Sequence, residues 1–268
     1  MTDDAAPHFV ESLARGLAVI RAFDASRPEM TLAELARATG LARATTRRFL
    51  LTLVDLGYAR TDGRQFSLTP RVLELGFSYL SGLPLAELAR PILEALSHEL
   101  GESTSASVLD GDDIVYVARV PTRRIMNVTI TIGTRFPAFA TSMGRVLLAE
   151  LPPAELSGVL ARLGQAAPTA RTETNPDRLR EILGEVHRQG WALVDQELED
   201  GLRSIAAPVR GDDGTVVAAI NVATSTTGAT LEQMHDVYRP ALLRAAAELG
   251  TALAHARPSL HGGAAPRP

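Results

Sequence analysis

The chain has 268 residues, of which 46% are hydrophobic, and it has no cysteine and a formal net charge of −4. This length allows one large domain or two of ordinary size, and the lack of cysteine excludes disulfides, thiolate zinc sites and a cysteine nucleophile. No uninterrupted apolar run of about 18 residues occurs, so no membrane span is expected. The acidic, polar start MTDDAAPHF is unlike a signal peptide, and we therefore expect a cytoplasmic protein.

The first 60 residues carry the signals of three helices. Residues 1–8 are expected to form a loose tail, and apolar residues at helical spacing predict an amphipathic helix over 10–23. Thr31, with Glu34 three residues later, predicts a capping box at the start of a second helix. Gly40 fits the left-handed position that ends that helix. The third helix begins only about three residues later, a pattern typical of a helix-turn-helix.

The third helix has two different faces. Residues at helical spacing are expected to face the core, namely Ala42, Thr45, Phe49, Leu53 and Leu56. The outer face of its N-terminal half carries Arg43, Thr46, Arg47 and Arg48. A helix with such a basic, hydroxyl-bearing face can enter the major groove of DNA, although a face that is merely solvated has the same composition.

A wing is predicted directly after this helix. Asp62-Gly63 between alternating residues predicts a β-hairpin, with Arg60 and Arg64 near its tip. The segment from Arg37 to Arg64 contains six arginines and only two aspartates, so it is cationic although the chain as a whole is acidic. The chain contains arginine but no lysine. Arginine can bind guanine edges and phosphates with two parallel hydrogen bonds.

We assign base contacts to Arg43, Thr46 and Arg47, and phosphate or minor-groove contacts to Arg48, Arg60 and Arg64. Two alternatives stay open: Thr45 packs in the core, and Arg48 forms a surface ion pair with Asp55. A two-fold dimer of such units would read a roughly palindromic site.

The rest of the chain predicts an apolar connector and a mixed α/β domain. Thr69-Pro70 opens a helix that we read as a linker packed on a partner subunit; the alternative is that it caps its own domain. Two hairpins are expected around Asp110-Gly111 and Asp213-Gly214, and residues 257–268 are expected to be loose. The predicted strands are 103–109, 114–120, 125–132, 191–194, 204–209 and 216–223, and the predicted helices are 84–100, a short helix from Ser142, 153–163, 176–189 and 230–255. This order suggests a curved antiparallel sheet covered by helices, hence an α+β fold.

Particular segments resemble a known family. They are LAELARATGLARATTRRFLLTLVDLGY and FSLTPRVLELG in the first half, and ATSMGRVLLA, VDQELEDGLRSIAAPV and AAINVAT in the second. In this order they resemble the IclR family of transcriptional regulators. Residues 118–149 more narrowly resemble the PcaR/PcaU/PobR branch, which regulates the breakdown of aromatic acids such as protocatechuate and 4-hydroxybenzoate.

The resemblance implies a winged helix-turn-helix domain at 9–69, a linker helix at 70–83 and a GAF-like effector domain at 84–256. It also implies homodimers, often paired into tetramers. One departure is Ala42, where many relatives have a serine that caps the recognition helix. A missing cap costs about 1 kcal/mol.

Three stretches are expected to converge on a small aromatic carboxylate. The helix beginning at Thr141, Ser142 and Met143 could hold the carboxylate at its free N–H groups, although ordinary capping explains the same residues. Arg135 is the preferred cationic partner, with Arg123 and Arg124 as further candidates, and all three could instead be exposed.

Polar groups of the later strands complete the expected effector site. Asp195 and Glu197 could accept a hydrogen bond from a phenolic hydroxyl, or pair with Arg203 for structural reasons. Ser204 and Asn221 lie in strands, where a polar side chain needs a partner. The resemblance places effector contacts near Ser142, Met143, Asp195, Ser204, Asn221 and Ala223. Relatives that bind small acids have serine at the last two positions, so a differently shaped ligand is implied.

We expect no catalytic residue, no metal site and no cofactor. The six histidines are scattered, and no nucleophile elbow, phosphate loop or dinucleotide fingerprint occurs. The leading hypothesis is a ligand-responsive DNA-binding regulator. One alternative is an enzyme that processes a small acid with Asp195 or Glu197 as base; another is a signal-binding module that has lost operator specificity.

Overall fold

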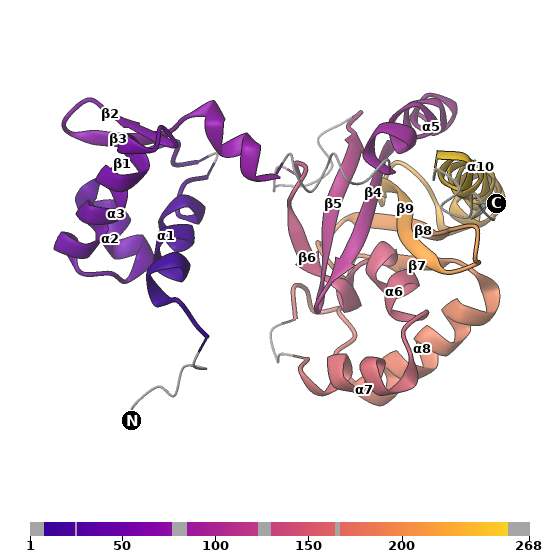
Figure 1. The fold of residues 1–268 in the computed structure, drawn as a ribbon. Coiled ribbons are helices and arrows are strands. Elements are labelled where there is room, and N and C mark those ends of the chain that lie inside the picture. The colour runs from indigo at the N-terminus through magenta and orange to yellow at the C-terminus, as the bar shows by residue number, and fades with distance from the viewer. Residues whose placement is uncertain (1–7, 25, 77–84, 123–129, 164–166, 257–268) are drawn as a thin grey trace, which may run out of the picture. The chain divides into compact units, whose positions relative to one another are not determined.

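A computed structural model describes residues 8–24, 26–76, 85–122, 130–163 and 167–256 (Figure 1). The chain divides into two compact units, residues 1–82 and residues 83–268, and each unit is described by itself. The expected α+β class is confirmed, because a helical unit with a small sheet precedes a unit built on a larger antiparallel sheet.

The N-terminal unit is a helix-turn-helix with a wing. Its predicted capping box and left-handed glycine are both present: the Thr31 hydroxyl accepts from the Glu34 N–H, and Gly40 has φ 68°. Sequence patterning misses β1, which pairs antiparallel with β3 and gives a sheet of order β1-β3-β2. The elements are α1 (Glu11–Arg21), β1 (Glu29–Thr31), α2 (Leu32–Thr39), α3 (Arg43–Asp55), β2 (Ala59–Thr61), β3 (Gln65–Leu68) and a 3-10 turn at Pro70–Val72.

The buried residues of this unit show which face of α3 packs against the core. Its buried side chains are Thr46, Leu50 and Leu53, at i, i+4 and i+7. Leu56, expected inside, is half exposed, and Thr45 is only partly buried. The predicted stripe was therefore wrong by about one residue. Ala42, which began the predicted stripe, is the N-cap of α3 and makes no side-chain cap hydrogen bond.

The segment that leaves the wing is tied to the end of α3. The Thr69 hydroxyl donates to the Gly57 carbonyl (2.5 Å), and the Arg71 guanidinium donates to the Leu56 carbonyl (2.8 Å). Arg71 also lies over the Tyr58 ring, with 5.3 Å between its carbon and the ring centroid. Residues 73–76 are helical, and the rest of the predicted linker lies outside the described residues.

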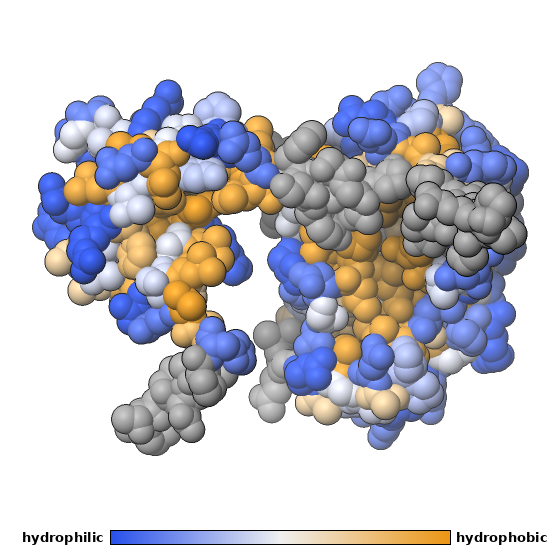
Figure 2. Space-filling model, in the orientation of Figure 1, coloured by the Kyte–Doolittle hydropathy of each residue, from blue (hydrophilic) through white to orange (hydrophobic). Residues whose placement is uncertain are grey.

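Apolar side chains remain uncovered on this unit. Leu13 and Leu17 on α1, and Phe9 and Val10 just before it, are all about half exposed, and Figure 2 shows the apolar colour gathered over this region. Leu73, at the start of the linker segment, is 74% exposed.

The C-terminal unit has three layers (Figure 1). A six-stranded antiparallel sheet of order β6-β5-β4-β9-β8-β7 carries α5 and α10 on one face and α6, α7 and α8 on the other. The elements are α5 (Leu85–Leu100), β4 (Ser103–Asp110), β5 (Asp113–Val120), β6 (Arg135–Pro137), a 3-10 turn at Ala138–Ala140, α6 (Ser142–Leu148), α7 (Pro153–Ala161), α8 (Pro176–Gln189), β7 (Ala192–Asp195), β8 (Leu202–Arg210), β9 (Val216–Ser225), α9 (Leu231–Gln233), a π turn at Met234–Tyr238 and α10 (Arg239–Ala256).

One predicted strand is wrong in its described part. Residues 125–129 of the expected 125–132 strand lie outside the described residues, and residues 130–132 form loop and turn. The strand that pairs with β5 here is β6, which ends at a proline. The two predicted hairpins are confirmed, with Gly111 and Gly214 in left-handed conformation at their turns.

Helix α6 lies unusually close to the turn that precedes it. Gly144 has no side chain, and a Cβ at this position would overlap the carbonyl oxygen of Ala138. Glycine therefore permits α6 to rest on backbone, which places its first turn against the sheet.

Candidate functional sites

The arginines of α3 and the wing border one groove. Arg43, Arg47 and Arg64 line a groove of about 500 Å³ in the N-terminal unit, together with residues of α2 and the wing. Arg43 and Arg47 lie one turn apart on α3, and both are exposed. A groove of this kind presents guanidinium groups to an anionic surface, as recognition of DNA requires.

The other predicted DNA residues are not among those that line this groove. Arg48 is exposed, and no ion pair joins it to Asp55 in the described part of the chain. Arg60 is exposed on the wing, and its Nε donates to the Ser67 hydroxyl (3.0 Å). Thr46 is fully buried, and its hydroxyl donates to the Ala42 carbonyl (3.2 Å). The assignment of Thr46 to base reading is therefore corrected, because the shifted phase of α3 turns this residue into the core.

The second candidate site is a cavity between the sheet and α6. Six of the predicted effector residues line it, namely Thr141, Ser142, Met143, Ser204, Asn221 and Ala223. Sequence reasoning missed the other lining residues, namely Tyr116, Arg119, Ile130, Val194, Leu198 and Leu202. The free volume is about 20 Å³, roughly the space of one water molecule.

Arg119 is the charged side chain among the described residues that line this cavity. Its guanidinium donates to the Ser105 hydroxyl (3.3 Å), and no described carboxylate forms an ion pair with it. Burial lowers the pKa of Arg119, because a partly desolvated guanidinium is less stable when charged. An anion bound in the cavity would stabilise that charge.

A β-bulge explains why the sequence pattern conceals Arg119. Ser107 pairs with Tyr116 and Ala106 pairs with Ala118, so β5 has one extra residue, Val117, at this point. Strict alternation would send Tyr116 and Arg119 to opposite faces of the sheet. The extra residue restores Arg119 to the face of Tyr116.

Asn221 also faces the cavity and lacks a partner. Its side chain is 4% exposed, and its Oδ1 accepts no hydrogen bond from the residues that the structure describes. Its neighbours are already satisfied, since the Ser142 hydroxyl donates to Ser204 (2.8 Å) and the Ser107 hydroxyl to the Met143 sulfur (3.3 Å). Buried acceptors are normally paired, so the unpaired Asn221 Oδ1 is an exception among the described residues.

The first turn of α6 is capped by its own chain. The Thr141 hydroxyl accepts from the Gly144 N–H (3.0 Å), and α6 has only seven residues. Ordinary capping, the alternative that the sequence left open, thus accounts for Thr141.

Arg135 does not line the cavity. Its guanidinium is bound to Asp110 and Asp113 on the neighbouring hairpin, and these hydrogen bonds raise its pKa. It is about two-fifths exposed. The expectation that Arg135 holds the effector is corrected, because strand pairing of β6 with β5 carries it to the outer edge of the sheet. Arg123 and Arg124 lie outside the described residues.

Asp195 and Glu197 are held in ion pairs instead of facing the cavity. Asp195 accepts from Arg203 Nε (2.7 Å), the structural alternative that the sequence left open. Glu197 binds Arg145 on α6 (2.6 Å) and accepts from the Glu173 N–H (2.9 Å). Both expectations of ligand contact are therefore corrected, since each carboxylate already has a partner.

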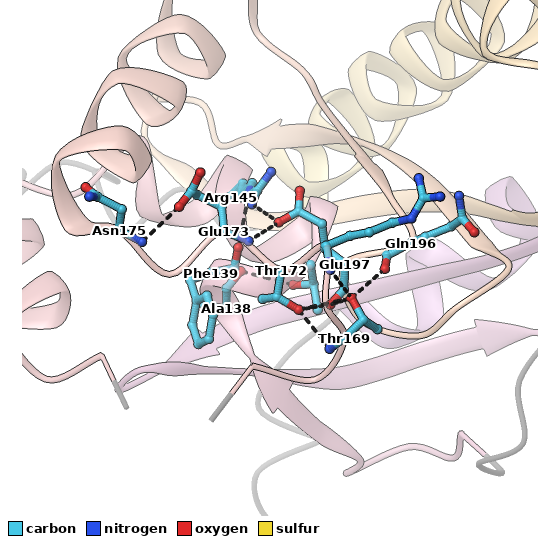
Figure 3. Close-up of polar contacts among 11 residues, drawn as sticks. Ala138, Phe139, Arg145, Thr169, Thr172, Glu173, Asn175, Gln196 and Glu197 are labelled. Atoms are coloured by element: carbon cyan, nitrogen blue, oxygen red, sulfur yellow. Dashed lines mark hydrogen bonds and ion pairs between the residues drawn. The ribbon is translucent and has the colours of Figure 1, made fainter. Parts of the chain in front are cut away.

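Figure 3 shows that Arg145 and Glu197 join three segments of the chain. The Arg145 side chain, 4% exposed, also donates to the Phe139 carbonyl (2.9 Å), and the Thr172 hydroxyl donates to the Glu197 carbonyl (2.6 Å). This network fixes α6 to the β7–β8 loop. Both segments contribute lining residues to the cavity, so the network holds two parts of the cavity wall together.

The loop that carries Glu197 has an unusual backbone. Gln196 has φ 65°, the one positive value of a non-glycine residue in the described chain, and this conformation is costly for a side chain of its size. Its N–H donates to the Leu202 carbonyl (2.7 Å), and its side-chain oxygen accepts from the Gly201 N–H (3.2 Å). These bonds close the loop around Leu198.

Two searches of the described residues find nothing further. No helix there is long and apolar enough to cross a membrane. No group of three or more histidine, aspartate or glutamate side chains is placed to hold a metal ion.

The two units define a class of protein: a winged helix-turn-helix joined to an α/β unit with a buried cavity. Comparisons with known proteins give its family. Residues 12–63 match the IclR helix-turn-helix domain, and residues 77–251 match the bacterial transcriptional regulator IclR C-terminal domain. The chain belongs to the IclR family of transcriptional regulators, and the predicted resemblance is confirmed.

The relatives narrow the family to its aromatic-acid branch. The chain is 46% identical over 244 residues to the Pca regulon regulatory protein of Pseudomonas putida, covering 91% of this chain and 84% of that one. A solved transcriptional regulator from Rhodococcus is 55% identical, with a TM-score of 0.82, covering 93% and 100%. An IclR homologue from Microbacterium hydrocarbonoxydans, solved in complex with 4-hydroxybenzoate, is 26% identical, with a TM-score of 0.78, covering 90% and 98%.

The family and these relatives are regulators that bind DNA, and the protein is accordingly a transcriptional regulator and not an enzyme.

Proposed function

We propose that the protein regulates aromatic acid catabolism and that its C-terminal unit binds an aromatic carboxylate in the cavity beside Arg119. The observation that carries this proposal is a half-buried guanidinium with no carboxylate partner in the described chain. The remainder of the lining is mostly apolar, as a benzenoid ring requires. The relative with bound 4-hydroxybenzoate supports the aromatic class.

Binding must enlarge the cavity, because about 20 Å³ is far less than an aromatic ring occupies. Met143 and Leu198 are suited to move: methionine has flexible, polarizable packing, and Leu198 lies on a loop. A ligand that fits only the enlarged form shifts the equilibrium toward that form. This differential affinity is what coupling to DNA binding requires.

The proposal is tested by titrating the full chain with protocatechuate and 4-hydroxybenzoate while following the melting temperature. Saturation at one hundred times Kd stabilises the protein by about 2.7 kcal/mol. Arg119→Gln is expected to weaken binding roughly 10- to 100-fold, because a charge-assisted hydrogen bond is lost. Arg135→Gln is the matched control and should bind normally. No stabilisation by any aromatic acid would refute the effector proposal and leave the family assignment untouched.

On the DNA side, we propose that Arg43 and Arg47 contact base edges and that Arg48, Arg60 and Arg64 contact phosphates. Arg47→Ala should cost about 1–3 kcal/mol on an operator selected from random duplexes and relax its sequence preference. Arg64→Ala should weaken binding to all duplexes and lower the salt dependence. Uniform weakening by Arg47→Ala would instead support a module without operator specificity.

We also propose that the protein is a homodimer, which can pair into a tetramer, and that it reads a roughly palindromic operator. The exposed apolar side chains of Leu13 and Leu17 on α1, and of Phe9 just before it, support self-association of the winged unit. A two-fold dimer places two recognition helices on successive turns of DNA. Because we propose that it acts on chromosomal DNA, we also propose that the protein is cytoplasmic.

A further inference from the structure

We infer that Arg71 is a positioning residue that ties the recognition helix α3 to the linker segment (residues 70–76 of the described chain), and that it thereby sets the spacing between operator half-sites that the protein accepts. The inference rests on the proposed function, because it concerns a dimer that reads two half-sites. It adds the residue that holds each reading helix in place. Arg71 is not among the residues that line the groove of Arg43 and Arg47.

The Arg71 side chain meets the C-terminal end of α3. Its Nη1 donates to the carbonyl oxygen of Leu56, the C-cap residue of that helix (2.8 Å). Its guanidinium carbon lies 5.3 Å from the centroid of the Tyr58 ring, which is a cation–π contact. A Cβ at Gly57 would come within 3.2 Å of the same nitrogen, so the absence of a side chain at this glycine leaves room for the guanidinium.

The charge of Arg71 suits the end of the helix that it contacts. The last carbonyl groups of a helix lack partners within the helix and carry partial negative charge. The last turn of α3 contains no basic residue, so α3 does not supply a cation there itself. Arg71 supplies it from the linker segment, at the end of α3 opposite to Arg43, the first residue of the helix.

Burial of apolar side chains does not hold the later part of the linker segment in place. Residues 73–76 are helical and exposed, and Leu73 is 74% exposed. Among the described residues 70–76, Arg71 is the one whose side chain forms a hydrogen bond with the end of α3. The hydroxyl of Thr69, just before this segment, donates to the Gly57 carbonyl. The direction in which the linker segment leaves the winged unit therefore depends on these two polar anchors.

The placement of the two reading helices in the proposed dimer follows from this attachment. The linker segment lies on the chain that joins each winged unit to residues 83–268, and its Leu73 and Leu75 are exposed for contact with a second copy. Moving a half-site by one base pair shifts it about 3.4 Å along the DNA and turns it by roughly 35°. A firmly attached α3 cannot follow this shift, whereas a loosely attached one can, at the cost of being ordered on binding.

The test measures binding of the full-length protein to duplexes that differ only in the spacing of their half-sites. The operator is selected from random duplexes with the unmodified protein, and its half-sites are then moved one base pair closer together or further apart. The unmodified protein should lose at least about tenfold in affinity on either change. Arg71→Met keeps the alkyl stem without its donors. It should bind the original operator more weakly and lose less than about threefold on either change.

The controls separate positioning from a general loss of structure. Glu74→Gln breaks the exposed ion pair with Arg71 and leaves the bond to Leu56 in place, so it should keep the spacing preference. Arg71→Lys keeps the charge and a donor and should restore most of that preference. Base preference within a half-site should stay the same in every variant, because Arg43 and Arg47 are unchanged. A winged unit that is merely destabilised would instead weaken binding to all three spacings equally.

The outcomes distinguish this inference from the function on which it rests. Arg71→Gln replaces the methionine variant where that variant does not fold, as judged by thermal melting followed by circular dichroism. A spacing preference that persists in the Met and Gln variants would overturn this inference alone, as would equal binding of the three spacings by the unmodified protein. A selected operator without two half-sites would overturn the proposed dimer on a palindromic operator as well.

Discussion

The buried ion pair between Arg145 and Glu197 makes a quantitative prediction about stability. The two side chains are 4% and 13% exposed. Glu197→Leu removes the carboxylate at similar volume and leaves the Arg145 guanidinium with only the Phe139 carbonyl. Breaking one member of a buried pair leaves an uncompensated charge and typically costs about 3–5 kcal/mol. In a unit of this size the melting temperature should fall by roughly 6–20 °C.

The assay is urea unfolding followed by fluorescence of Trp191, the single tryptophan of the chain, which lies in the C-terminal unit. If the two units unfold separately, the fluorescence of Trp191 reports the unfolding of the C-terminal unit alone. Glu99→Gln, which breaks the exposed pair with Arg244, is the matched control and should cost less than about 1 kcal/mol.

A double variant separates the ion pair from the packing. Arg145→Met with Glu197→Leu replaces both charges by apolar groups of similar shape, a change that is often neutral. We expect it to be more stable than Glu197→Leu alone, with a coupling energy of about 2 kcal/mol or more. Additive effects of the two substitutions, or a cost of Glu197→Leu below about 1 kcal/mol, would refute the account of the network given above.

Two other predictions concern the same unit. Gly144→Ala should destabilise it by several kcal/mol, because overpacking against a backbone carbonyl forces α6 off the sheet. Gly184→Ala in α8, where a Cβ meets nothing, should stabilise it by about 0.5–1 kcal/mol; equal effects would contradict the close approach of α6. Burial raises the pKa of Tyr116 to about 12. Since the folded state holds this proton more tightly, its contribution to stability is present below pH 10 and is lost as the pH rises towards 12. Tyr116→Phe should remove that part of the pH dependence in denaturant titrations.

Features that depend on local chemistry could be predicted from the sequence. The capping box of Thr31 and Glu34, the left-handed Gly40 and the Asp62-Gly63 turn are each set by a few adjacent residues, and all are confirmed. In the second unit, the strands and helices other than β6 also followed from periodicity and turn residues, whereas the strand expected at 125–132 is wrong in its described part.

Features that depend on tertiary context could not be predicted from the sequence. Threonine occurs both in the core and on the surface of helical proteins. The adjacent Thr45 and Thr46 therefore did not show which face of α3 is buried, and the predicted buried face was displaced by about one residue. The bulge at Val117 reverses the parity of β5 and hides Arg119 from any alternation rule. Likewise no local signal distinguishes Glu197 as a partner of Arg145, 52 positions earlier in the chain, from Glu197 as a ligand contact.

The left-handed backbone of Gln196 has a mechanical consequence. A non-glycine residue in this conformation costs about 1 kcal/mol or more, so the β7–β8 loop keeps its shape through its bonds to Leu202, Gly201 and Arg145 and not through its own preference. These contacts therefore hold the loop in a conformation that is strained at Gln196. In the effector binding that we propose, displacement of Leu198 would let Gln196 leave this strained conformation, and the strain released would lower the work of enlarging the cavity.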